Sequence, residues 1–200
     1  MRAPPLSLLA AIAKLNDLLE QRQLDLARLL MQTLARELTS GGFKSASFTW
    51  LEAIFHDQNE DWLVALTKIT EAAHLDPCNS GIQRSREVIC SRTRSALAGL
   101  TDHDQRVPEL YQVLLMAGAV ESDDHLKMAR FHAHHGHPEE ALRLLDAIIA
   151  LNPVSVDALA TKALLLGSQS RCTEAMEAAV EASRWGFESV PFVFSGVVRA

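Results

Sequence analysis

The feature that most constrains the fold of this chain is a recurring spacing of alanines. The two members of each pair stand at positions i and i+12: Ala53 with Ala65, Ala129 with Ala141, and Ala163 with Ala175. The last two pairs are related to one another by a shift from i to i+34. Self-similarity at a fixed period of about 20–50 residues is typical of stacked structural repeats. The spacing therefore predicts a chain built from repeated units.

Prolines support the same register. Pro77 stands at i+12 from Ala65 and Pro153 at i+12 from Ala141, so a proline ends the second helix in two units. Where two helices of a hairpin cross closely, only a small side chain lets their axes approach. Because one hairpin cannot bury both of its apolar faces, larger residues are expected between neighbouring hairpins. Those at suitable offsets are Trp62, Ile69, Leu145 and Leu166.

Composition indicates that the repeated unit is helical. The chain has only 9 Gly and 7 Pro among 200 residues and few aromatics, a mixture that favours helices over sheets. Apolar residues at helical spacing predict an all-α fold of ten helices in five hairpins. The expected helices are 6–20, 23–38, 47–57, 60–75, 81–99, 108–120, 123–135, 138–151, 156–168 and 171–184.

We expect one domain over residues 1–200. Its repeats are 6–38 (degenerate), 46–79, 81–120 (divergent), 122–155 and 156–189, followed by an apolar tail at 190–200. Pro77 and Pro153 are separated by two repeat lengths plus eight positions, and the surplus is expected in the loop 101–107 and the long helix before it. Two interpretations of the tail stay open: it caps the last repeat, or its Phe192 and Phe194 dock on a second molecule to give a homodimer.

The segment 123–153, which includes MARFHAHHGHPEEALRLLDAIIALNP, resembles the tetratricopeptide repeat family. Ala129, Gly136, Ala141 and Pro153 stand at motif positions, and segments 46–77 and 156–189 are the next most similar. The resemblance covers about half of the chain. It implies a right-handed superhelix, a solenoid of about five antiparallel helix hairpins, in which the first helix of each pair lines the concave side.

The resemblance also implies where a partner would bind. Groove positions of the family map here onto Trp50, Ile54, Leu126, Arg130, Ala160 and Leu164. Family members that hold the acidic C-terminus of heat-shock chaperones carry Lys, Arg and Asn at such places, whereas this chain has essentially only Arg130. The implied groove is therefore mostly apolar and suits an extended or helical segment with hydrophobic anchors.

Sequence signatures of catalysis or phosphate binding, such as GxGxxG, GxxxxGK[ST], HExxH and GxSxG, do not occur, and we expect neither an enzyme nor a cofactor. The densest group of potential ligands is His125, His132, His134, His135 and His137. His132 and His135 share a helix face and are weak candidates for a metal site, because imidazole binds zinc, copper and nickel. The turn at Gly136 scatters the rings, so solvated histidines are the preferred interpretation.

Charge and hydropathy restrict the partners and the compartment. The net charge of −6 predicts no broad basic surface for binding nucleic acid. No apolar stretch reaches the length of a membrane span. The apolar run 6–13 is too short for a secretory signal. Three cysteines at irregular spacings indicate reduced thiols in the cytoplasm.

We therefore expect a non-catalytic adaptor that binds a protein or peptide segment. The alternatives are a chaperone similar to those of type III secretion, which hold an unfolded client, and a histidine-rich metal-binding protein or enzyme.

Overall fold

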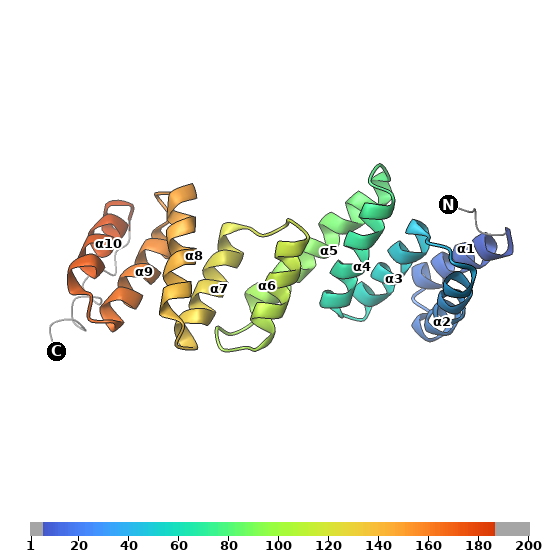
Figure 1. Ribbon diagram of the computed structural model, residues 1–200, viewed down its shortest axis with the longest axis horizontal. Coiled ribbons are helices and arrows are strands. Elements are labelled where there is room, and N and C mark those ends of the chain that lie inside the picture. The colour runs from blue at the N-terminus through green and yellow to red at the C-terminus, as the bar shows by residue number, and fades with distance from the viewer. Residues whose placement is uncertain (1–5, 187–200) are drawn as a thin grey trace. The chain divides into compact units, whose positions relative to one another are not determined.

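The computed structural model describes residues 6–186, and every regular element in that range is an α-helix (Figure 1). The helices are α1 (Leu6–Glu20), α2 (Leu24–Gly41), α3 (Ala46–Gln58), α4 (Trp62–Leu75), α5 (Ser80–Gly99), α6 (Arg106–Met116), α7 (Ser122–His134), α8 (Pro138–Leu151), α9 (Val156–Ser168) and α10 (Cys172–Arg184). The predicted all-α class is confirmed for these residues.

Helix ends agree with the predicted ones to within three residues, with one exception. Helix α6 ends at Met116 instead of residue 120. Gly118 adopts a left-handed conformation with φ +63°, and the N–H of Ala119 donates to the carbonyl of Leu114 at 2.9 Å. A glycine in this conformation ends a helix, because it turns the chain away while the last carbonyls remain hydrogen-bonded.

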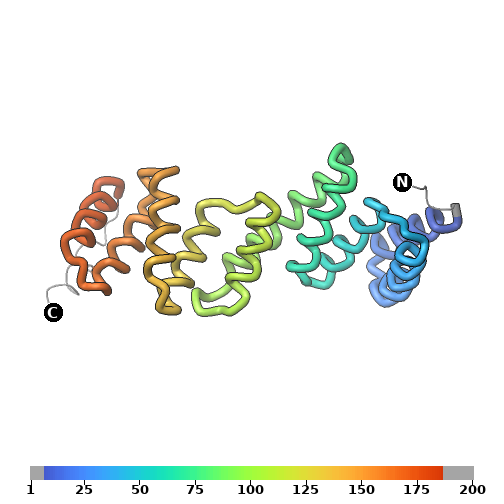
Figure 2. The backbone as a smooth tube through the Cα atoms, in the orientation of Figure 1, coloured from blue at the N-terminus to red at the C-terminus, as the bar shows by residue number. Residues whose placement is uncertain are grey.

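Two compact units divide the described residues, 6–96 with 113–119 and 97–112 with 120–186. In the first unit, α1 packs against α2 and α3, α2 packs against α3, and α3 packs against α4. In the second unit, α7 packs against α8 and α9, α8 packs against α9, and α9 packs against α10. Helices that are neighbours in the chain therefore pack together from α1 to α4 and from α7 to α10, joined by short turns that Figure 2 traces.

Hairpins begin at regular intervals along the chain. Helix α3 begins at Ala46 and α5 at Ser80, which stand at positions i and i+34, and the starts of α7 and α9 at Ser122 and Val156 have the same spacing. The interval from Ser80 to Ser122 is longer by eight positions. Helix α5 has 20 residues where α3, α7 and α9 each have 13, so the longer helix accounts for most of the surplus. The connection 100–105 is also longer than the connections 59–61 and 135–137, and the shorter α6 offsets that difference.

The six alanines of the recurring pairs are buried, as close helix crossing requires. Ala53, Ala65, Ala129, Ala141 and Ala163 are each 0% exposed and Ala175 is 2% exposed. Of the larger residues expected between hairpins, Ile69, Leu145 and Leu166 are at most 1% exposed, whereas Trp62 is half-buried. The core of each unit therefore combines alanines within hairpins and branched aliphatic side chains.

Candidate functional site

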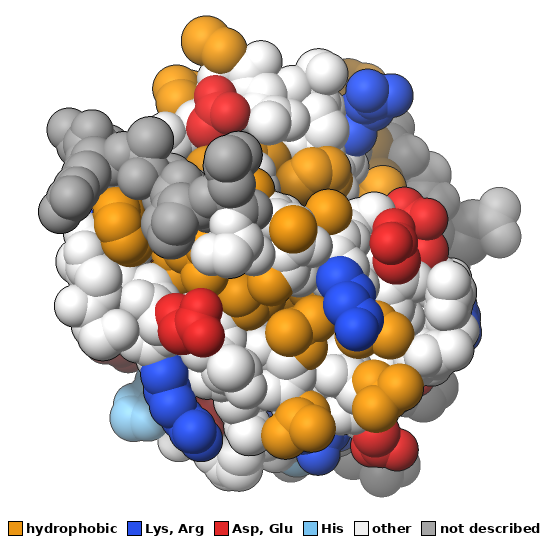
Figure 3. All heavy atoms as spheres, turned by 90° about the vertical axis from the view of Figure 1, so that its right-hand side faces the viewer, with side chains coloured by type: hydrophobic (Ala, Val, Ile, Leu, Met, Phe, Trp, Pro, Cys, Tyr) orange, Lys and Arg blue, Asp and Glu red, His pale blue; other side chains and the backbone are white. Residues whose placement is uncertain are grey.

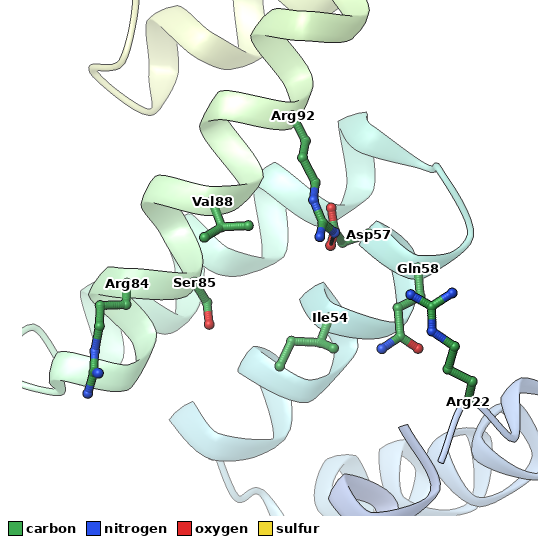
Figure 4. Close-up of a pocket in the computed structure, with 8 residues that line it drawn as sticks. All are labelled: Arg22, Ile54, Asp57, Gln58, Arg84, Ser85, Val88 and Arg92. Atoms are coloured by element: carbon green, nitrogen blue, oxygen red, sulfur yellow. Dashed lines mark hydrogen bonds and ion pairs between the residues drawn. The ribbon is translucent and has the colours of Figure 1, made fainter. Parts of the chain in front are cut away.

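A cleft of about 310 Å³ lies between α3 and α5 in the first unit (Figure 4), and we name it the Val88 cleft. Its lining comes from one face of each helix, because residues at helical spacing of three or four project together. Residues of α3, of α5 and of the turn between α1 and α2 contribute: Ile54, Asp57 and Gln58; Arg84, Ser85, Val88 and Arg92; and Arg22.

Charge in the Val88 cleft is dominated by arginine. The guanidinium of Arg92 donates to Oδ2 of Asp57, and the Asp57 side chain is only 8% exposed. Burial raises the pKa of Asp57, while the positive charge and hydrogen bond of Arg92 oppose the rise. Oδ1 of Asp57 and Oε1 of Gln58 are also buried, and neither has a hydrogen-bond donor among the described residues.

Trp50 joins the helices that form this region. Its indole Nε1–H donates to Oγ of Ser85 on α5 at 2.9 Å. The ring also lies against Gly81, where an added Cβ would come within 3.0 Å of it, so the absence of a side chain there lets α5 approach. Trp50 therefore contributes to the packing between α3 and α5, and part of its side chain remains exposed to solvent.

A second cleft, of about 530 Å³, lies between α7 and α9 in the second unit, and we name it the Leu164 cleft. It is lined by Arg130, Ala133 and His134 of α7, by Thr161, Leu164, Leu165 and Ser168 of α9, and by Asp102. Leu164 is 56% exposed near the middle of α9. The cleft therefore offers an apolar centre with polar side chains at its rim.

The connection between α5 and α6 reaches this second cleft through contacts with α7. Nζ of Lys127 lies 2.9 Å from Oδ1 of Asp102 and also donates to the carbonyl of Leu100. The ring centroids of His103 and His134 are 4.3 Å apart. These contacts fix Asp102 beside α7, so a loop residue and a helix residue line the same cleft.

The six groove positions implied by the sequence divide into accessible and buried residues. Ile54 lines the Val88 cleft, and Arg130 and Leu164 line the Leu164 cleft. Trp50 is half-buried, whereas Leu126 and Ala160 are 9% and 7% exposed and belong to the interior.

The sequence offers one basic concentration, Arg84, Arg86, Arg92 and Arg94, with a solvated face as the preferred interpretation and docking of an acidic partner as the alternative. Apart from Arg84, Arg92 and Ile54, the lining residues of the Val88 cleft are not sequence-based candidates. The divergent segment had no repeat register, so its cleft residues on α5 could not be assigned to a groove position. Arg84, Val88 and Arg92 nevertheless recur at every fourth position, and that spacing was the available signal.

The histidine group does not converge on one point. The ring of His135 stacks on Phe131 with centroids 4.0 Å apart, whereas the His132 ring lies edge-on to His137 at 6.0 Å. Tyr111 and Nδ1 of His125 are hydrogen-bonded at 2.8 Å. Among residues 6–186, no three His, Cys, Asp or Glu side chains are arranged to hold a metal ion.

The fold changes the titration of His132. Its Nδ1 is buried without a hydrogen-bond partner among the described residues. Burial lowers the pKa of His132, the nearby His137 and His135 lower it further, and Glu140 opposes them. The folded protein therefore disfavours a charged imidazole at this position.

Hydrophobic side chains also gather on the surface over α1 and α2 (Figure 3). Leu9 on α1 and Leu26 and Leu29 on α2 are 47%, 55% and 65% exposed. The expected cap or dimer contact at Phe192 and Phe194 lies outside the described residues. No helix within residues 6–186 is both long and apolar enough to span a membrane.

Comparison of the chain with protein-family models and with curated proteins finds no match.

Proposed function

We propose that this chain is a helical-repeat protein of the tetratricopeptide type, without catalytic activity, that binds segments of partner proteins in the Val88 and Leu164 clefts. The proposal includes a right-handed solenoid arrangement of the hairpins and action in the cytoplasm.

The observation that carries this proposal is the coincidence of repeat geometry with cleft position. Hairpins recur at the i to i+34 spacing with buried alanines at their crossings, and each cleft lies between the first helices of consecutive hairpins. In stacked hairpin proteins this is the concave side, where extended or helical segments bind.

The lining of the clefts supports binding more than catalysis. Val88 and Leu164 are 49% and 56% exposed, so each cleft presents an aliphatic side chain to solvent. The Val88 cleft adds three arginines, Ser85 and Gln58, and the Leu164 cleft adds Arg130, Thr161 and Ser168, all of which can orient a partner. An apolar anchor point with a polar rim is the usual anatomy of a protein interface.

The test is capture of partner proteins by cleft variants with matched controls. Val88→Glu and Leu164→Glu place a charge in the clefts at positions that are already half-exposed, so the fold should tolerate them. Leu63→Glu on α4 and Val180→Glu on α10 are controls, because these residues are 39% and 43% exposed on second helices of hairpins.

Each tagged protein is incubated with a lysate of the organism that encodes the chain, and the bound proteins are identified by mass spectrometry. We expect a defined set of partners that the wild type and both controls retain and that at least one cleft variant loses. Retention of the same partners by both cleft variants would contradict binding in these clefts.

A further inference from the structure

We propose that the Val88 cleft selects an acidic segment, one in which an aliphatic side chain is flanked by carboxylates. This inference rests on the proposed function and adds the chemistry of the partner. Two properties of the cleft carry it: positive charge without a carboxylate partner among residues 6–186, and an apolar centre.

Three arginines and one aspartate are among the residues that line the Val88 cleft. Arg92 is paired with Asp57, but neither Arg22 nor Arg84 lies within ion-pair distance of a carboxylate among the described residues. Arg84 is instead hydrogen-bonded to Ser80, one turn earlier on its own helix. The cleft thus carries excess positive charge in a chain whose net charge is −6, which is complementary to carboxylates on a partner.

The apolar centre lies between these charges. Figure 4 shows Ile54 and Val88 in the middle of the group, with Arg84 and Arg22 on opposite sides. An aliphatic side chain that enters between Ile54 and Val88 would remove apolar surface from water. Residues before and after it in the partner would then lie toward the two arginines.

The apolar centre distinguishes a peptide from a small anion. A phosphate group would satisfy the arginines but would leave Ile54 and Val88 uncovered. A peptide carries carboxylates and an aliphatic side chain together, so the combination favours a peptide.

The experiment selects ligands without assuming their sequence. A library of displayed random peptides, free of terminal charge, is selected on the full chain, and an enriched peptide is then synthesised with blocked ends. Its affinity is measured by fluorescence anisotropy for the wild type, for the Arg22→Gln/Arg84→Gln double variant and for Val88→Glu. Arg36→Gln/Arg143→Gln is the control, because it removes the same charge from exposed positions outside the cleft.

We expect the enriched peptides to share an aliphatic residue with acidic residues on both sides. Binding should weaken about tenfold in the double arginine variant, a change of about 1.4 kcal/mol, and should be lost in Val88→Glu and unchanged in the control. Replacing the peptide's carboxylates by amides should weaken wild-type binding by a similar factor. The double arginine variant should show no further loss with the amide peptide.

Enrichment of basic or uncharged peptides, or an affinity that the arginine substitutions leave unchanged, would overturn the inference. Failure to enrich any peptide would also overturn it. So would a wild type that binds inorganic phosphate but no peptide, if the double arginine variant does not bind the phosphate. The proposed function has a separate criterion: loss of captured partners in Leu164→Glu would sustain it even where the Val88 cleft selects no acidic segment.

Discussion

Replacing Ala141 by leucine should destabilise the protein far more than the same replacement at Ala150 on the same helix. Ala141 is 0% exposed within the cluster that includes Ala129 and Leu145, whereas Ala150 is exposed near the end of α8. Leucine and alanine have similar helix propensities, so the comparison isolates packing. An isobutyl group at a filled site forces neighbouring side chains or the helix axes apart.

The expected loss follows from that geometry. Overpacking of a filled core costs about 1–3 kcal/mol, whereas Ala150→Leu should change the free energy of unfolding by less than about 0.5 kcal/mol. The assay is urea unfolding followed by far-ultraviolet circular dichroism, with the midpoint and slope compared among the wild type and both variants. Equal midpoints for the two variants would refute the assignment of Ala141 to the helix crossing.

Three further outcomes are expected. Trp50→Phe removes the donor to Ser85 and should lower the free energy of unfolding by about 0.5–1.5 kcal/mol; an unchanged urea midpoint would argue against this bond. Gly136→Ala places a Cβ at φ +76° and should cost about 1 kcal/mol in the same assay, and no loss would show that the turn relaxes. Folding lowers the pKa of His132, so the unfolded chain binds a proton at this residue more readily than the folded protein does. The neutral imidazole therefore contributes to the free energy of unfolding above the ordinary histidine pKa, and this contribution is lost as the pH falls from the ordinary pKa through the lowered one. His132→Leu should therefore flatten the decline of the urea midpoint between about pH 7 and about pH 5, whereas His74→Gln, at an exposed position, should leave the decline as in the wild type.

Much of the helical architecture was predictable from local patterns. Apolar spacing located the helices, and the alanine pairs identified positions that the structure buries. Pro138 begins α8, and Pro77 and Pro153 follow the ends of α4 and α8. Proline fits the first turn of a helix and disfavours the helical conformation at the residue before it, so these helix boundaries are predictable from the sequence. These features depend on residues a few positions apart.

The candidate site was less predictable because it depends on contacts between distant residues. The pairing of Asp57 with Arg92 joins α3 to α5 across 35 positions, and no local pattern specifies it. The repeat position of Leu126 predicts a groove residue, yet its side chain is 9% exposed because the hairpins pack over it. A repeat position defines a direction on a helix, whereas accessibility depends on how far the neighbouring helices extend over that direction.

The additional length of α5 has a rotational consequence. Relative to the 13-residue first helices it contains seven more residues, which is within about 20° of two complete helical turns. Ile82, Ile89, Thr93 and Leu97, spaced by seven, four and four residues, are all at most 2% exposed, so the buried stripe continues along the whole helix. Five extra residues would have rotated the later part of the stripe by about 140° and exposed it. A first helix can therefore lengthen by about 10 Å and keep its buried stripe on one face, provided that the added length is close to a whole number of turns.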